Sequence, residues 1–292
     1  MTRVQELEHF VYGDPALFDL SKFGTAEFPL RASGLQAIAK CPWRIVSMLV
    51  LDSKDEAGPA AHTGSAMHAA VERFHQDGDV VAAVEAMHGR RDEYPMADLD
   101  DAAKLFFAYS QDPRNAGAKV VLSETKASFS IKPHPEDPTQ APICVSMRLD
   151  QVRWDGAQFK LFDLKTSKRD GPTLLAESIY QISAYCVGAS VVLGKTVEPG
   201  ALITPRKYLV RGTDPSSAPP GVFWHYTFNY AQCEHVLRGV REIVAHIRSG
   251  RVWLNGGDYC NWCIHRGVDV CVHKFAEWDA KREQARLALS TV

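Results

Sequence analysis

Apolar residues recur at helical spacing through much of the first 118 residues. Between residues 63 and 75, for example, Met67, Val71 and Phe74 fall on one face, which is typical of an amphipathic helix. Ser33 is a candidate N-cap for a further helix. Residues 1–30 show no sustained period and are expected to form a loosely packed lead-in. The predicted helices of this region cover residues 33–50, 63–75, 80–89 and 98–110.

After residue 119 the pattern changes to the alternation of apolar and polar residues that is typical of strands. The predicted strands cover residues 120–131, 143–154, 157–165, 201–210 and 222–228. Asp155-Gly156 is a tight-turn signal, so the first three strands are expected to form an antiparallel meander. Helical patterns return at residues 173–192, 230–250 and 274–289. This order predicts a single α/β domain over residues 1–292, with a helical part (33–118), a catalytic sheet core (119–230) and a C-terminal helix with a cysteine cluster (231–292).

The composition is that of an ordinary globular protein. Of 292 residues, 46% are hydrophobic and 23% charged, which is enough to bury a full core. No apolar run approaches the length of a membrane span, and the charged N-terminus lacks the apolar centre of a signal peptide. We therefore expect no membrane partner and a cytoplasmic location, in a bacterium or in the host of a phage. The formal net charge of −2 excludes a uniformly basic surface but leaves room for a local basic groove.

Two acidic residues and a lysine fall at neighbouring strand ends. Asp163 and Lys165 are two residues apart and so face the same side of their strand. Asp150, near the end of the preceding strand, can lie opposite them. Two carboxylates beside a lysine suit a divalent cation that activates water for attack on a phosphate. A salt bridge at a surface strand end is the alternative.

Two helical pairs could extend such a site. His68 and Glu72 lie one turn apart on the helix predicted over residues 63–75, and either could be a ligand. Gln181 and Tyr185, also four residues apart, could present hydrogen-bond donors to a phosphate or sugar. For each pair, ordinary packing on an amphipathic helix is the alternative.

The cysteines form a separate set. There are seven, an odd number in a chain without an export signal, so disulfides are not expected. Cys260, Cys263 and Cys271 fall within twelve residues, and Cys41 lies far upstream. Four thiolates with a Cys-x2-Cys pair suit either Zn²⁺ or an iron–sulfur cluster, and the chemistry alone leaves both open.

Six segments, in order, resemble the RecB-like branch of the PD-(D/E)XK nuclease superfamily. They are SGLQAIAKCPWRI, GSAMHAAVERF, MRLDQV, FDLKTSK, YQISAYCVG and YCNWCIHRGVDVC. Within this branch the chain is similar to the iron–sulfur members, which include CRISPR-associated adaptation nucleases, AddB-type helicase–nucleases and phage exonucleases. The resemblance implies a restriction-endonuclease-like core of order α-βββ-α-β, in which helices flank a mixed sheet.

The resemblance also implies roles for individual residues. It makes Lys165 the catalytic lysine, and it makes Glu124 an acid that supports the site. The ligands of Mg²⁺ or Mn²⁺ would be His68, Asp150, Asp163 and the main-chain carbonyl of Leu164. The residues expected to contact DNA are Gln181 and Tyr185, together with the basic Lys168 and Arg169 that follow the third strand. The ligands of a 4Fe–4S cluster, with Zn²⁺ as the alternative, would be Cys41, Cys260, Cys263 and Cys271. Arg148 departs from the small residue common before the first aspartate and is expected to face solvent or DNA.

The function implied is that of a metal-dependent DNA exonuclease that acts on DNA ends, prefers single strands and serves recombination, replication or phage DNA processing. No P-loop is present, so a helicase, recombinase or integrase would be a separate partner. The alternatives are a non-catalytic DNA-binding or assembly module, a CRISPR-type nuclease that processes protospacers, and a zinc-stapled binding protein.

Overall fold

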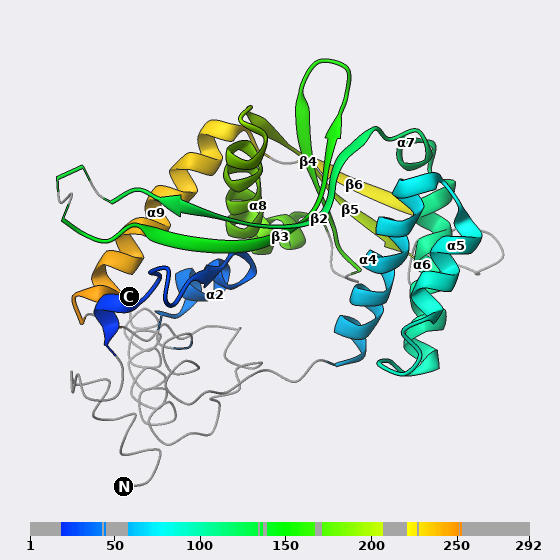
Figure 1. Cartoon of the computed structure of the whole chain (residues 1–292), viewed down its shortest axis with the longest axis horizontal. Helices are drawn as coiled ribbons and strands as arrows, with labels where there is room; N and C mark the ends of the chain where they lie inside the picture. The colour runs from blue at the N-terminus through cyan, green and yellow to red at the C-terminus, as the bar shows by residue number, and fades with distance from the viewer. Residues whose placement is uncertain are drawn as a thin grey trace, which may run out of the picture.

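A mixed six-stranded sheet separates two hydrophobic cores, with helices packed on both of its faces (Figure 1). The computed structural model describes residues 19–42, 44, 58–133, 135–136, 139–166, 171–206, 221–226, 228–250 and 252. The fold class predicted from the sequence, α/β with helices flanking a mixed sheet, is confirmed.

The sheet is built around a three-stranded meander. Strands β2 (Val120–Ile131), β3 (Ile143–Trp154) and β4 (Phe159–Leu164) pair antiparallel in succession, as predicted. Strand β5 (Val197–Arg206) then joins parallel to β4, and β6 (Gly221–Tyr226) pairs antiparallel with β5. The parallel step needs a long crossover, which helix α8 (Gly171–Leu193) supplies.

One core lies between β2, β3 and three helices. Helices α2 (Leu35–Lys40), α8 and α9 (Tyr230–Arg248) bury apolar residues against this part of the sheet. Helix α9 begins with a reciprocal capping box between Asn229 and Gln232, which satisfies backbone donors at its first turn.

The other core lies between the sheet and a second group of helices. It is formed by α4 (Pro59–Asp77), α5 (Val80–His88) and α6 (Met96–Gln111), and the short α7 (Pro113–Ala116) follows. Met67, Val71 and Phe74 are buried on one face of α4, as their spacing predicts. Leu164 and Ile203, from the adjacent strands β4 and β5, close this core from the sheet side. Helix α4 is thereby placed against the strand ends.

The prediction of a loose lead-in over residues 1–30 is wrong for its described part. Phe23 is fully buried, and β1 (Leu30–Arg31) pairs parallel with β3, after the short 3-10 helix η1 (Leu20–Lys22). Isolated apolar residues without a period gave no signal of this long-range pairing. Ser33 does not cap a helix, because it lies inside the 3-10 turn η2 (Ala32–Gly34) and Gly34 is the N-cap of α2.

The helix predicted over 274–289 and the cluster of Cys260, Cys263 and Cys271 lie outside the described residues. Among the helices that are described, none has the length and apolar character needed to cross a membrane.

Candidate active site

The site lies where β3 interrupts the regular alternation between side chains that face the α8 core and side chains that face the opposite side of the sheet. Leu149 and Val152 both face the α8 core although they are three positions apart, so the alternation shifts at Asp150 and Gln151. The register of β2 with β3 places Glu124 opposite Asp150. Glu124 has a φ of 45°, which is a strained conformation for a residue other than glycine. These irregularities bring two carboxylates together at facing positions of two strands.

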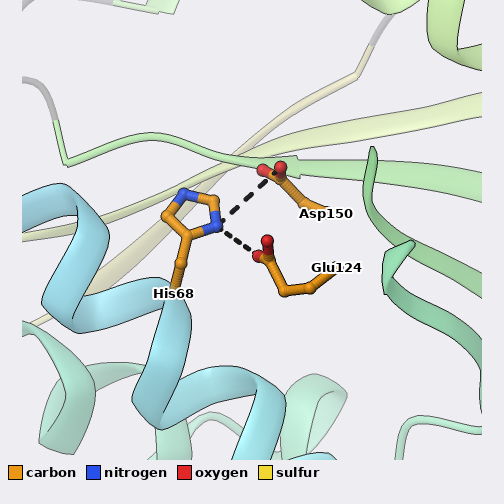
Figure 2. A group of neighbouring side chains, drawn as sticks. All are labelled: His68, Glu124 and Asp150. Carbon is orange, nitrogen blue, oxygen red and sulfur yellow. Dashed lines mark hydrogen bonds and ion pairs between the residues drawn. The ribbon is translucent and has the colours of Figure 1, made fainter. Parts of the chain in front are cut away.

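Helix α4 brings His68 to the same point (Figure 2). Its Nδ1 lies 2.5 Å from Glu124 Oε1 and 3.8 Å from Asp150 Oδ1. One ligand atom from each of these three residues lies within 4.8 Å of the others, which is the spacing of a possible cation site. The sequence prediction that His68 and Asp150 meet therefore agrees with the geometry. Glu124, expected only as a supporting acid, contacts the histidine directly.

Strand β4 contributes the second aspartate, and the lysine follows directly after its last residue. The backbone N–H of Leu164 donates to Asp150 Oδ2 at 2.7 Å, which ties the two strand ends together. Lys165 Nζ lies 3.2 Å from Asp163 Oδ1 and 2.9 Å from Oδ2, and only the contact with Oδ1 has hydrogen-bond geometry. Asp163 is 1% exposed. The Asp-x-Lys spacing thus places both side chains on the same side, as predicted.

Helix α8 completes a hydrogen-bonded chain that starts at the lysine. Lys165 Nζ donates to Gln181 Oε1 at 2.9 Å, and Gln181 Nε2 donates to the Tyr185 hydroxyl at 2.8 Å. Tyr185 is 5% exposed, and its burial raises the pKa of its hydroxyl. In this arrangement Gln181 and Tyr185 orient Lys165, in addition to any contact with DNA.

The electrostatics reflect several charges in a buried space. Burial raises the pKa of Asp150 to about 7, because the charged carboxylate is costly away from water. For His68, burial opposes the charged form, but the carboxylates of Asp150 and Glu124 outweigh it and raise its pKa to about 9. For Lys165, burial is likewise outweighed by Asp163 and Asp150, so its pKa is raised. The cluster therefore favours positive charge at its centre.

Arg148, which departs from the family pattern, closes the outer side of this cluster. Its Nε lies 2.7 Å from Glu124 Oε2, and its side chain is 55% exposed. Glu72, considered from the sequence as a rival ligand beside His68, lies 3.9 Å from Arg148 and is not in the three-residue group. The helical spacing alone could not decide between His68 and Glu72, since the position of α4 over the sheet selects which of the two reaches the strand ends.

The donor set suits a hard divalent cation. Carboxylate oxygens are the ligands that Mg²⁺ and Mn²⁺ prefer, and Asp150, Glu124 and His68 converge. Asp163 Oδ2 is buried and accepts no hydrogen bond, but it lies 2.9 Å from Lys165 Nζ, so a cation bound there would share this oxygen with the ammonium group. Lys168 and Arg169, predicted to contact DNA, lie outside the described residues, as do three of the four cysteines predicted to bind a cluster. The fourth, Cys41, is 5% exposed at the end of α2.

The fold and this site are those of a nuclease that uses a divalent metal. The model of the PD-(D/E)XK nuclease superfamily matches residues 29–271, and the chain belongs to that superfamily. The match spans the elements that carry His68, Asp150 and Lys165.

Seventeen chains of solved structures match this chain. A protein from Eubacterium rectale provisionally assigned as an exonuclease has a TM-score of 0.52 and 13% identity, covering 87% of this chain and 92% of its own. The structure of SSO0001 covers 91% of this chain and 94% of its own, with 12% identity and a TM-score of 0.37. A comparison with curated proteins gives no significant match.

Proposed function

We propose that this nuclease is a DNA exonuclease that acts on DNA ends, with a preference for single strands, in recombination, replication or phage DNA processing. The proposal that this chain cleaves phosphodiester bonds is supported by one observation: Asp150, Asp163 and Lys165 converge beside His68. End and strand preference rest on the sequence resemblance to RecB-like exonucleases. The single domain over residues 1–292 is part of the same proposal.

The proposed ligands of Mg²⁺ or Mn²⁺ are His68, Asp150, Asp163 and the Leu164 carbonyl, with Glu124 as a supporting acid. A bound cation would supply Lewis-acid stabilisation of the phosphate charge and a water of lowered pKa. Lys165 would offset the charge that develops on the phosphate and orient the attacking water, while Gln181 fixes the position of its ammonium group.

DNA contacts are proposed for Gln181, Tyr185, Lys168 and Arg169. A 4Fe–4S cluster, with Zn²⁺ as the alternative, is proposed on Cys41, Cys260, Cys263 and Cys271. Both proposals rest on spacing and resemblance. Joining Cys41 to ligands more than two hundred residues away would constrain the unfolded chain, so the role of the metal would be structural.

The test uses full-length protein purified without oxygen. Its visible spectrum and its iron and zinc content are recorded first. Linear and circular single- and double-stranded DNA, labelled at either end, are then incubated with Mg²⁺ or Mn²⁺. We expect linear single strands to shorten progressively from an end and circular strands to remain intact.

The control pair is Lys165→Ala and Lys104→Ala, since Lys104 is an exposed lysine on α6, away from the site. Only Lys165→Ala should lose cleavage. Equal cutting of circular and linear DNA would replace the exonuclease assignment with an endonuclease. Binding of DNA with no cleavage under any metal would favour the assembly module. A colourless protein that contains zinc and still cleaves DNA would overturn only the proposal of an iron–sulfur cluster.

A further inference from the structure

One face of the β1–β3–β2 part of the sheet carries basic and hydroxyl side chains. Along β2 and β3, alternate residues such as Ala127, Phe129 and Met147 face the α8 core. The intervening residues therefore face the other way. We call this set the outer hairpin face; its members are Arg31, Lys126, Ser128, Ser130, Cys144, Ser146 and Arg148.

The register arranges these residues in rows across the strands. Lys126 pairs with Arg148 in the row next to the site, and Ser128, Ser146 and Arg31 form the following row. Successive rows advance by about 6.6 Å, twice the rise per residue of a strand. The rows thus lead away from the Glu124–Asp150 position in regular steps.

The charge on this face is of one sign. Arg31, Lys126 and Arg148 are exposed, and no acidic residue occupies an outward position in these rows of the described strands. Arg148 contacts Glu124 at the border of the site, whereas Arg31 and Lys126 make no ion pair within the described part of the chain. Arg31 and Lys126 therefore give this face a local positive charge in a chain of formal net charge −2, and such a face suits a polyanion.

The arrangement of these side chains in rows fits an extended phosphodiester strand better than it fits a compact acidic ligand. Cations and hydroxyls in successive rows are the groups that contact phosphates along a backbone. The step between rows is close to the phosphate-to-phosphate step of an extended single strand. The rows also end at Arg148, which lies 2.7 Å from Glu124 of the candidate metal group, so a strand along this face would arrive next to that group.

We propose that the outer hairpin face binds the DNA strand next to the phosphate that is cut, with Lys126 and Arg31 contacting successive backbone phosphates. This inference rests on the proposed nuclease function and adds the path of its substrate. The proposed contacts lie on β1, β2 and β3. They are therefore separate from the Asp-x-Lys segment and from the Gln181–Tyr185 segment of α8.

The test compares Arg31→Gln/Lys126→Gln with the control Arg91→Gln/Lys104→Gln, which removes two exposed cations from the second group of helices instead. Arg148 is kept because it contacts Glu124. Binding of a labelled single-stranded oligonucleotide of about 15 nucleotides is measured at several salt concentrations, with Ca²⁺ in place of Mg²⁺. Each phosphate contact contributes about 0.7 to the slope of log K against log salt, so the outer-face variant should lose about 1.4 from that slope. Its Kd should rise about tenfold at moderate salt, and the control should match the wild type.

An unchanged slope in the outer-face variant, with wild-type protein that binds and cleaves, overturns this proposal and leaves the nuclease function in place. An equal loss in both double variants also overturns it, because the effect would then be one of overall charge. Wild-type protein that neither binds nor cleaves DNA overturns the proposed function itself.

Discussion

The backbone N–H of Leu164 donates to Oδ2 of Asp150 at 2.7 Å, so a residue of β4 orients the carboxylate of β3. An asparagine at position 150 keeps this acceptor through its carbonyl oxygen but loses the negative charge. We therefore expect Asp150→Asn to fold and to lose cleavage about a thousandfold or more, the equivalent of several kcal/mol of metal-assisted stabilisation.

The same variant should be more stable than the wild type in chelator. Burial disfavours the charged form of Asp150 beside Asp163, so its removal should raise Tm by about 2 °C or more. Added Mn²⁺ should then raise the Tm of the wild type but not that of the variant. Thermal unfolding with and without metal checks both statements, and an equal metal shift in both proteins would show that Asp150 is not a ligand.

The contact between Glu124 and His68 predicts a metal-dependent defect. Carboxylates that orient a ligand histidine support metal binding, and their loss costs about 10–100-fold in metal affinity or activity. Glu124→Gln retains the length and one acceptor, so it should be milder than Glu124→Ala. We expect the Mn²⁺ concentration for half-maximal cleavage to rise, with most of the maximal rate recovered at saturating metal. If saturating Mn²⁺ does not restore the cleavage rate of these variants, Glu124 does not act by supporting metal binding.

The chain from Lys165 through Gln181 to Tyr185 predicts coupled effects. Tyr185→Phe removes the acceptor of Gln181 Nε2 while keeping the buried ring, and the cost should be about 1 kcal/mol, or about fivefold in cleavage. Gln181→Ala removes the partner of Lys165 and should cost more. The double variant should be no slower than Gln181→Ala alone, because both changes act through one contact with the lysine. Single-turnover rates for the four proteins check this, and additive losses would indicate independent roles.

Much of this arrangement follows from local sequence pattern. The strand pattern over 120–131 and 143–154 coincides with β2 and β3, because alternation reports a sheet with one covered face. Likewise, i,i+2 spacing was enough to place Asp163 and Lys165 on one side of the chain at the end of β4. These features depend on neighbours within a few residues, which sequence patterns describe well.

The features that were missed depend on contacts between distant segments. The pairing of Leu30 with Val145 joins residues that no local period connects. The contact of Glu124 with His68 needs a positive φ at Glu124 and the placement of α4 over the strand ends, neither of which a sequence window reports. Packing between elements also decided that His68 rather than Glu72 joins the carboxylates.

Gly200 occupies the register shift between β4 and β5. A Cβ added there would lie 2.5 Å from the backbone oxygen of Leu161, a contact that only a backbone movement relieves. Gly200→Ala should therefore cost about 2–3 kcal/mol of unfolding free energy and lower cleavage, since Asp163 lies in the second pair of the ladder after the shift. Gly239→Ala, on an exposed turn of α9 with open space around it, should instead stabilise the protein by about 0.5–1 kcal/mol. Urea unfolding of the two variants checks the contrast, and equal effects would contradict the close approach at Gly200.

Because the imidazole ring of His75 is buried, we expect protonation of this residue to lower the free energy of unfolding in acid. It is packed between α4 and α6, where its Nε2 lies 2.7 Å from the Tyr109 hydroxyl, and burial and the nearby Arg153 lower its pKa to about 4. Because the folded state favours the neutral ring, its contribution is complete above the unfolded pKa of about 6.5 and is lost as pH falls toward 4. His75→Gln removes the titrating group, so its unfolding free energy should fall less than that of the wild type between pH 7.5 and pH 5, by about 2 kcal/mol. Urea unfolding at the two pH values measures this difference, and parallel losses in both proteins would assign the acid sensitivity to other groups.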